Sequence, residues 1–158
     1  MNTRRKHKYF ERETGAPEPV SVGVSHRCQF SEVDALAIVW HGRYAGFFEK
    51  ASEELGRKIG LSYQSMYAAG VSAPLAQLHI DYHRPLKLSE VCTIRASVIW
   101  TEASRLNIEY VIFKEDGTVA CTGYTVQMFV DSGSGEVCIL SPDLLVECRN
   151  NWRRGDFN

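Results

Sequence analysis

The strongest constraint on the fold of this chain is a long amphipathic stretch from Gly42 to about Ile59. Its apolar side chains recur at three- and four-residue spacing, the period of an α-helix with one buried face: Tyr44, Phe47, Phe48, Ala51, Leu55 and Ile59. Most of its charged residues fall off that stripe, and Gly60 follows, a residue type that favours helix ends. The stretch predicts one long helix that must bury one side against another layer.

The segments around this helix have the patterns of β-strands. Residues 20–30 alternate in part and predict a first strand. After a short connector come four more strand-like runs, at about 73–83, 92–101, 104–114 and 119–131. Pro85 ends the first of these runs, and Glu115-Asp116-Gly117 predicts a hairpin turn between the last two. One long helix followed by antiparallel strands predicts a single α+β domain.

The two ends of the chain differ from this middle part. Residues 1–20 have charges, Gly15 and two prolines but little periodicity, so they predict a flexible tail, and residues 21–150 form the predicted domain. Near the other end, Ser141 and Pro142 have the form of a helix start, with serine as the cap and proline at the first position.

Composition excludes several classes of function. The chain has 18 basic and 19 acidic residues among 158, so it has no broad positive field for nucleic acid. No run approaches the roughly 18 apolar residues that a membrane helix needs, and no apolar stretch follows the basic N-terminus as in a secretory signal. The five widely spaced cysteines favour free thiols in a reducing cytoplasm.

The segment before the predicted helix has the most distinctive pattern. Asp34 lies in an apolar loop, and a His41-Gly42 pair follows where the helix begins. The segment resembles the signature of hotdog-fold acyl-CoA thioesterases, in the branch of 4-hydroxybenzoyl-CoA thioesterase and YbgC. The signature matches at Phe30, Asp34, Val39, His41, Tyr44, Phe47, Phe48 and Glu49, and Tyr82-His83-Arg84-Pro85-Leu86 is similar to a second family segment.

This resemblance implies an antiparallel sheet wrapped around one long central helix, and hydrolysis of an acyl-CoA thioester to free acid and CoA. Asp34 would act as nucleophile or as general base, and the sequence leaves both open. At the helix start, His41 would contribute its backbone N–H to an oxyanion hole or its imidazole to proton transfer. Gly42 would let the substrate approach the backbone. Ala37 departs from the family, which usually has glycine there.

The resemblance also implies where CoA binds. Arg84, Lys87 and Arg105 lie near the predicted ends of strands that border the CoA channel in this fold, and arginine binds phosphate well. No metal or redox cofactor is expected. Because the family forms its active site between subunits, we expect a homodimer or homotetramer.

Three alternatives remain open at this point. Glu49 could replace Asp34 as the catalytic carboxylate, as a helix glutamate does in another branch of hotdog thioesterases. His79, Asp81 and His83 would share one face of a strand at the spacing of a metal site, although polar surface residues explain the same pattern. The protein could also be a hotdog acyl-thioester dehydratase or hydratase, or an acyl-CoA-binding module without catalysis.

Overall fold

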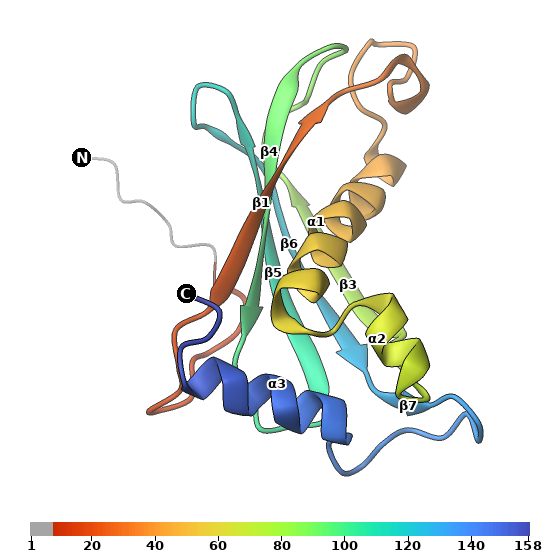
Figure 1. Cartoon of the computed structure of the whole chain (residues 1–158). Helices are drawn as coiled ribbons and strands as arrows, with labels where there is room; N and C mark the ends of the chain where they lie inside the picture. The colour runs from red at the N-terminus through yellow and green to blue at the C-terminus, as the bar shows by residue number, and fades with distance from the viewer. Residues whose placement is uncertain (1–7) are drawn as a thin grey trace.

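The structure, a computed structural model, describes residues 8–158, and its centre is a five-stranded antiparallel sheet with one long helix against it (Figure 1). In spatial order the strands are β1 (Val20–Arg27), β4 (Val91–Ile99), β5 (Arg105–Lys114), β6 (Val119–Met128) and β3 (Leu75–Tyr82). The helix is α1 (Tyr44–Ile59). The predicted α+β class and the hotdog arrangement of a sheet around one central helix are confirmed.

The apolar stripe of α1 packs on the sheet as its period predicts. All of its members are buried: Tyr44, Phe47, Phe48, Ala51, Leu55 and Ile59. Phe48 stacks on Tyr110 of β5, with ring centroids 4.2 Å apart. Gly123 of β6 makes this approach possible, because a Cβ there would lie 2.6 Å from the Phe48 ring and 2.3 Å from the carbonyl oxygen of His79.

Shorter elements join these strands and the helix. Two 3₁₀ turns, η1 (Phe30–Glu32) and η2 (His41–Arg43), flank the loop that contains Asp34. A second helix, α2 (Tyr63–Ala68), and a small two-stranded sheet of β2 (Val71–Ser72) and β7 (Val130–Asp131) lie beyond the end of α1. The sequence pattern does not predict these elements, because they are too short to show a period.

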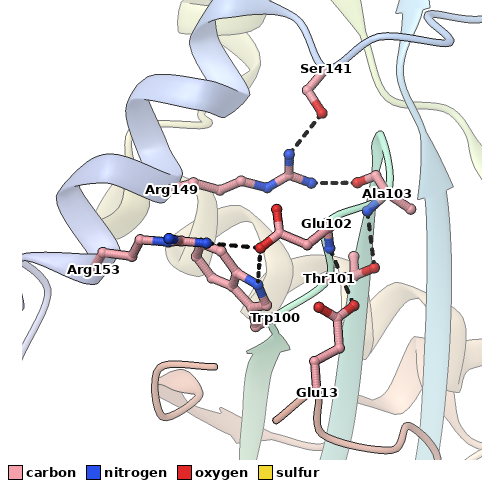
Figure 2. Close-up of polar contacts among 8 residues, drawn as sticks. All are labelled: Glu13, Trp100, Thr101, Glu102, Ala103, Ser141, Arg149 and Arg153. Atoms are coloured by element: carbon pink, nitrogen blue, oxygen red, sulfur yellow. Dashed lines mark hydrogen bonds and ion pairs between the residues drawn. The ribbon is translucent and has the colours of Figure 1, made fainter. Parts of the chain in front are cut away.

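Helix α3 (Asp143–Arg153) covers the end of the sheet far from the Asp34 loop (Figure 1). Figure 2 shows the polar contacts between α3 and the end of the sheet. The Glu102 carboxylate accepts from Arg153 of α3 at 2.8 Å and from the Trp100 indole N–H at 3.1 Å. The predicted cap is wrong by one residue, since Pro142 is the N-cap. The Ser141 hydroxyl instead accepts a 2.7 Å hydrogen bond from Arg149, because that guanidinium reaches back along the helix.

The N-terminal segment differs from the predicted tail over its described part. Residues 1–7 lie outside the described residues, whereas Tyr9 and Phe10 lie on the sheet face away from α1. The backbone N–H groups of Tyr9 and Phe10 donate to Glu109 at 2.8 and 2.9 Å. The Tyr9 hydroxyl donates to Asp81 at 2.6 Å and is 2.7 Å from the Thr122 hydroxyl. These polar partners come from three strands distant in sequence, which local composition does not reveal.

Candidate active site

Asp34 lies at the tip of a tight loop whose two sides are hydrogen-bonded to each other. The N–H of Trp40 donates to the carbonyl of Glu32 at 2.8 Å, and Val33 pairs with Val39. Nearer the tip, the N–H of Asp34 donates to the carbonyl of Ile38 at 2.9 Å. The loop is therefore a small hairpin, and its backbone bonds fix the direction from which Asp34 projects.

The turn at the tip holds one oxygen of the carboxylate. Oδ1 of Asp34 accepts the N–H of Leu36 at 2.8 Å, the local bond that aspartate often makes in turns. Ala37 closes the turn with φ of 59°, the left-handed region that glycine adopts at low cost. Ala37 therefore has the left-handed conformation that the glycine usual in the related family would adopt without strain, and alanine is strained there.

The helical segment begins a few residues after this loop and has free backbone donors. Within residues 8–158, the N–H of Arg43 donates to Trp40 at 2.9 Å, whereas the N–H groups of His41 and Gly42 have no acceptor. Such unsatisfied donors at a helix start favour an anion or a developing oxyanion. A Cβ on Gly42 would lie 2.2 Å from the Trp40 ring, so glycine is needed for that ring to pack against the backbone there.

The segment after β3 supports the loop and brings one predicted residue, Lys87, to it. The N–H of Val39 donates to Leu86 at 2.8 Å, that of Leu88 donates to Ala37 at 3.0 Å, and Ile38 pairs with Lys87. Lys87 thus borders the Asp34 loop. Arg84 lies at the same end of the sheet, because its N–H donates to Ala120 at the start of β6 at 3.0 Å. Both side chains belong to exposed residues.

Tyr82 is a contact of this region that the sequence pattern did not single out. Its hydroxyl donates to the carbonyl of His41 at 2.8 Å, and burial raises the pKa of Tyr82, which keeps the phenol protonated. Leu78, Ile80 and Tyr82 alternate with His79, Asp81 and His83, a pattern that favours burial of the apolar set, but Leu78 is 42% and Tyr82 52% exposed. The difference arises because β3 is the edge strand of the sheet. The family segment around Tyr82 was the available signal.

Arg105 is not brought together with the other predicted residues within one chain. It begins β5 and pairs with Met128, whereas the Asp34 loop lies near the opposite end of the same strands. Ile112, which lies level with Tyr82 across Cys121 of β6, is seven positions further along β5 than Arg105, roughly 23 Å of extended chain. Arg105 lies instead beside Leu145 and Arg149 of α3, and its buried Nε has no hydrogen-bond partner among the described residues.

The residues of the alternative sites lie elsewhere. Glu49 is exposed on α1. On the outer sheet face His79 is 3.0 Å from Asp81, while Nε2 of His83 is 2.8 Å from the Thr122 hydroxyl. The Tyr9 hydroxyl and then His79 hold the pKa of the Asp81 carboxyl below its usual range. Among residues 8–158, no group of three or more His, Cys, Asp or Glu side chains is placed to hold a metal ion.

The surroundings of Asp34 are apolar but open in the single chain. Phe30 is 82%, Leu36 77% and Trp40 47% exposed, and Asp34 is itself exposed. Exposed large apolar side chains grouped around a polar residue are typical of a surface that a partner or a ligand covers. In the part of the chain that the structure describes, no helix has the length and hydropathy to cross a membrane.

Comparison with known proteins agrees with this fold. The Acyl-CoA thioester hydrolase YbgC of Escherichia coli is 23% identical over 105 residues, 66% of this chain and 78% of that protein. The 1,4-dihydroxy-2-naphthoyl-CoA hydrolase of a Synechococcus strain is 25% identical over 126 residues, 76% of this chain and 83% of that protein. The crystal structure of a DHNA-CoA thioesterase from Staphylococcus aureus covers 85% of this chain and 95% of its own, with a TM-score of 0.72 and 24% identity.

A protein-family pattern also matches most of the chain. The pattern of the thioesterase-like superfamily matches residues 28–147, which include the Asp34 loop, α1 and the strands that follow. The chain belongs to the thioesterase-like superfamily, and it is a thioesterase of the hotdog fold.

Proposed function

We propose that this thioesterase hydrolyses an acyl-CoA thioester and that Asp34 is its catalytic carboxylate. The observation that carries the proposal is that Asp34, held at the tip of a hydrogen-bonded hairpin, is followed by a helix start at which the N–H groups of His41 and Gly42 are free. The names of the two relatives, a hydrolase of acyl-CoA thioesters and one of 1,4-dihydroxy-2-naphthoyl-CoA, support CoA thioesters as the substrate class.

Two reaction routes fit these groups. In one, a carboxylate oxygen of Asp34 attacks the thioester carbonyl, the C–S bond breaks, and CoA leaves as thiolate; water then hydrolyses the mixed anhydride. In the other, Asp34 takes a proton from water, whose oxygen attacks the carbonyl, and the tetrahedral intermediate expels the same thiolate. In both, the N–H groups of His41 and Gly42 would stabilise the negative charge on the carbonyl oxygen.

The CoA part of the substrate carries phosphate groups that basic side chains would bind. The phosphates of CoA suit Arg84 and Lys87, which lie at the same end of the sheet as Asp34. Arg105 would contribute only if a second subunit presents it to this site. The reaction needs no group beyond water and the CoA moiety of the substrate, and we place it in the cytoplasm.

We further propose that the active form is a homodimer or homotetramer. The edge strand β3 offers unpaired backbone groups and half-exposed apolar side chains, and the Asp34 loop is rimmed by Phe30, Leu36 and Trp40. Pairing through this edge would satisfy the strand and bring a second chain towards the open site. Sedimentation should give twice the 17.8 kDa chain mass or more. An active monomer would contradict the two-subunit site.

Substitution at Asp34 tests the proposed chemistry. Wild-type protein should release CoA from at least one member of an acyl-CoA panel, with or without chelator. Asp34→Asn and Asp34→Ala should stay folded and lose at least about 100-fold in kcat, the scale of general-base assistance, with little change in KM. His41→Ala should cost less if its backbone N–H is the main contribution. Normal turnover in Asp34→Asn, with an inactive Glu49→Gln, would assign the chemistry to the helix carboxylate.

A further inference from the structure

A polar cluster of a buried histidine, the half-buried Glu32 and the exposed Lys50 joins the base of the Asp34 loop to α1. Its centre is His26 near the end of β1, whose side chain is only 6% exposed. Nε2 of His26 lies 2.8 Å from Oε2 of Glu32, and Nδ1 lies 2.9 Å from Nζ of Lys50. The imidazole also packs on Phe47 of α1, with ring centroids 4.7 Å apart. Both ring nitrogens therefore have a partner, and the two partners come from different elements.

The partners decide which nitrogen of His26 carries the proton. A lysine ammonium can only donate, so Nδ1 must accept from Lys50. An ionised carboxylate can only accept, so Nε2 carries the proton and donates to Glu32. The arrangement is thus a negative charge and a positive charge joined through one neutral ring. Replacing that ring by a group without both functions breaks the link between Glu32 and Lys50.

Glu32 connects His26 to both sides of the Asp34 loop through two further hydrogen bonds. Its carboxylate also accepts the N–H of Gln29 at 3.2 Å, and its carbonyl accepts the N–H of Trp40 at 2.8 Å. Glu32 lies two residues before Asp34, and Trp40 comes immediately before His41. The hydrogen-bonded series Lys50–His26–Glu32–Trp40 therefore connects α1 with the base of the hairpin from which Asp34 projects.

We propose that His26 is a positioning residue for the reaction, a role that rests on the proposed function of Asp34. By holding Glu32 against α1, His26 sets the distance between the Asp34 carboxylate and the N–H groups of His41 and Gly42. An attacking carboxylate or water must meet a carbonyl whose oxygen those N–H groups bind. A displacement of about 1 Å between the two parts can cost on the order of 10²-fold in rate.

Two substitutions of His26 separate positioning from simple packing. His26→Gln keeps a carbonyl oxygen that can accept from Lys50 and an amide that can donate to Glu32. His26→Phe keeps an aromatic ring but makes neither bond. Lys50→Met removes one end of the series, and Lys58→Met is its control: Lys58 is on the same helix, and its Nζ donates to the carbonyl of Ser21 at 3.2 Å.

The proposal predicts a specific set of results. His26→Phe should stay folded and lose about tenfold or more in kcat, with KM changed by less than about twofold, because the CoA contacts are elsewhere. The amide of Trp40 should exchange with solvent faster in His26→Phe than in wild type. His26→Gln should recover kcat to within about threefold of wild type and restore the slow exchange. Lys50→Met should lower kcat, and Lys58→Met should leave it unchanged.

Other outcomes would overturn the proposal. It fails if His26→Phe keeps wild-type kcat, if His26→Gln is as impaired as His26→Phe, or if the loss lies in KM alone. It also fails if His26→Phe loses activity only in proportion to the unfolded fraction seen by circular dichroism. A wild-type protein without acyl-CoA hydrolysis would contradict the proposed function instead, and the exchange of the Trp40 amide would still decide whether His26 fixes the loop.

Discussion

The phenol of Tyr82 donates a 2.8 Å hydrogen bond to the carbonyl of His41, so the last residue of β3 is tied to the first residue of the helical segment. The Tyr82 ring also meets Tyr44 of α1 edge-on, with centroids 5.0 Å apart. Because β3 is an edge strand of the sheet, Tyr82 lies at the surface where we expect the second subunit. It is also bonded to the helix start where we expect the oxyanion hole. Assembly through this edge would therefore act on the geometry of the helix start.

Replacing Tyr82 by phenylalanine should cost stability through this one bond. The His41 carbonyl loses its side-chain donor, so we expect Tyr82→Phe to lower the free energy of unfolding by about 0.5–1 kcal/mol. Urea unfolding measures the change. Tyr67→Phe is the matched control, because Tyr67 is 88% exposed and should change stability by less than about 0.5 kcal/mol. Equal effects of the two substitutions would show that the Tyr82–His41 bond contributes nothing.

Replacing Ala37 by glycine should relieve strain in the Asp34 loop. The left-handed φ of 59° costs alanine roughly 1–2 kcal/mol, while glycine adds about 0.5–1 kcal/mol of unfolded-chain entropy. The free energy of unfolding should therefore rise by up to about 1 kcal/mol in Ala37→Gly. Ala35→Gly in the same loop, where φ is not positive, should lower it. Thermal unfolding of the pair that gave the opposite order would contradict the strain.

A methyl group at Gly123 should disturb the contact between α1 and the sheet. The added Cβ would meet the His79 carbonyl oxygen at 2.3 Å and the Phe48 ring at 2.6 Å, and the first of these is backbone. Overpacking of this kind costs about 1–3 kcal/mol or more, so Gly123→Ala should lower the melting temperature by several degrees. Gly46→Ala on α1 has open space around it and should raise stability slightly.

The cysteines should differ sharply in their reaction with a thiol reagent. Burial raises the pKa of Cys121 to about 12 and that of Cys148 to about 11, and Cys28 and Cys92 are 2% and 1% exposed. Cys138 is the half-buried member of the set of five. At pH 8 we expect one thiol to react quickly in the native protein and all five after denaturation. Three or more fast thiols would contradict the buried positions.

The Tyr9 contact should be sensitive to alkaline pH. Burial, and then the bond to Asp81, raise the pKa of Tyr9 to about 12 from its usual 10. The neutral phenol is therefore favoured in the folded state, and its stabilisation is present below pH 10 and is lost as the pH rises towards 12. Tyr9→Phe should unfold about 1 kcal/mol more easily at pH 7. In urea titrations the difference from wild type should shrink above pH 10; a constant difference would contradict it.

Local sequence patterns were sufficient for the main elements of the fold. The spacing of Phe47, Phe48, Ala51 and Leu55 predicts α1, and alternation predicts strands at the positions of β1 and β3 to β6. These signals work because helix and strand periods are set by the backbone within a few residues. The Asp34 loop was found from its motif, and its turn at Ala37 has the left-handed backbone suited to the glycine usual in the related family.

The tertiary structure determined the exposures and the long-range contacts that local sequence patterns do not predict. Alternation assigns Tyr82 to one side of a strand, but the strand order β1-β4-β5-β6-β3 leaves that strand at the edge and exposes it. The same order, with antiparallel register, places Arg105 at the end of the sheet opposite to Asp34. His26, Glu32 and Lys50 meet only because β1 and α1 pack together. Periodicity reports which side of an element is apolar, whereas partners distant in sequence are set by packing of the whole chain.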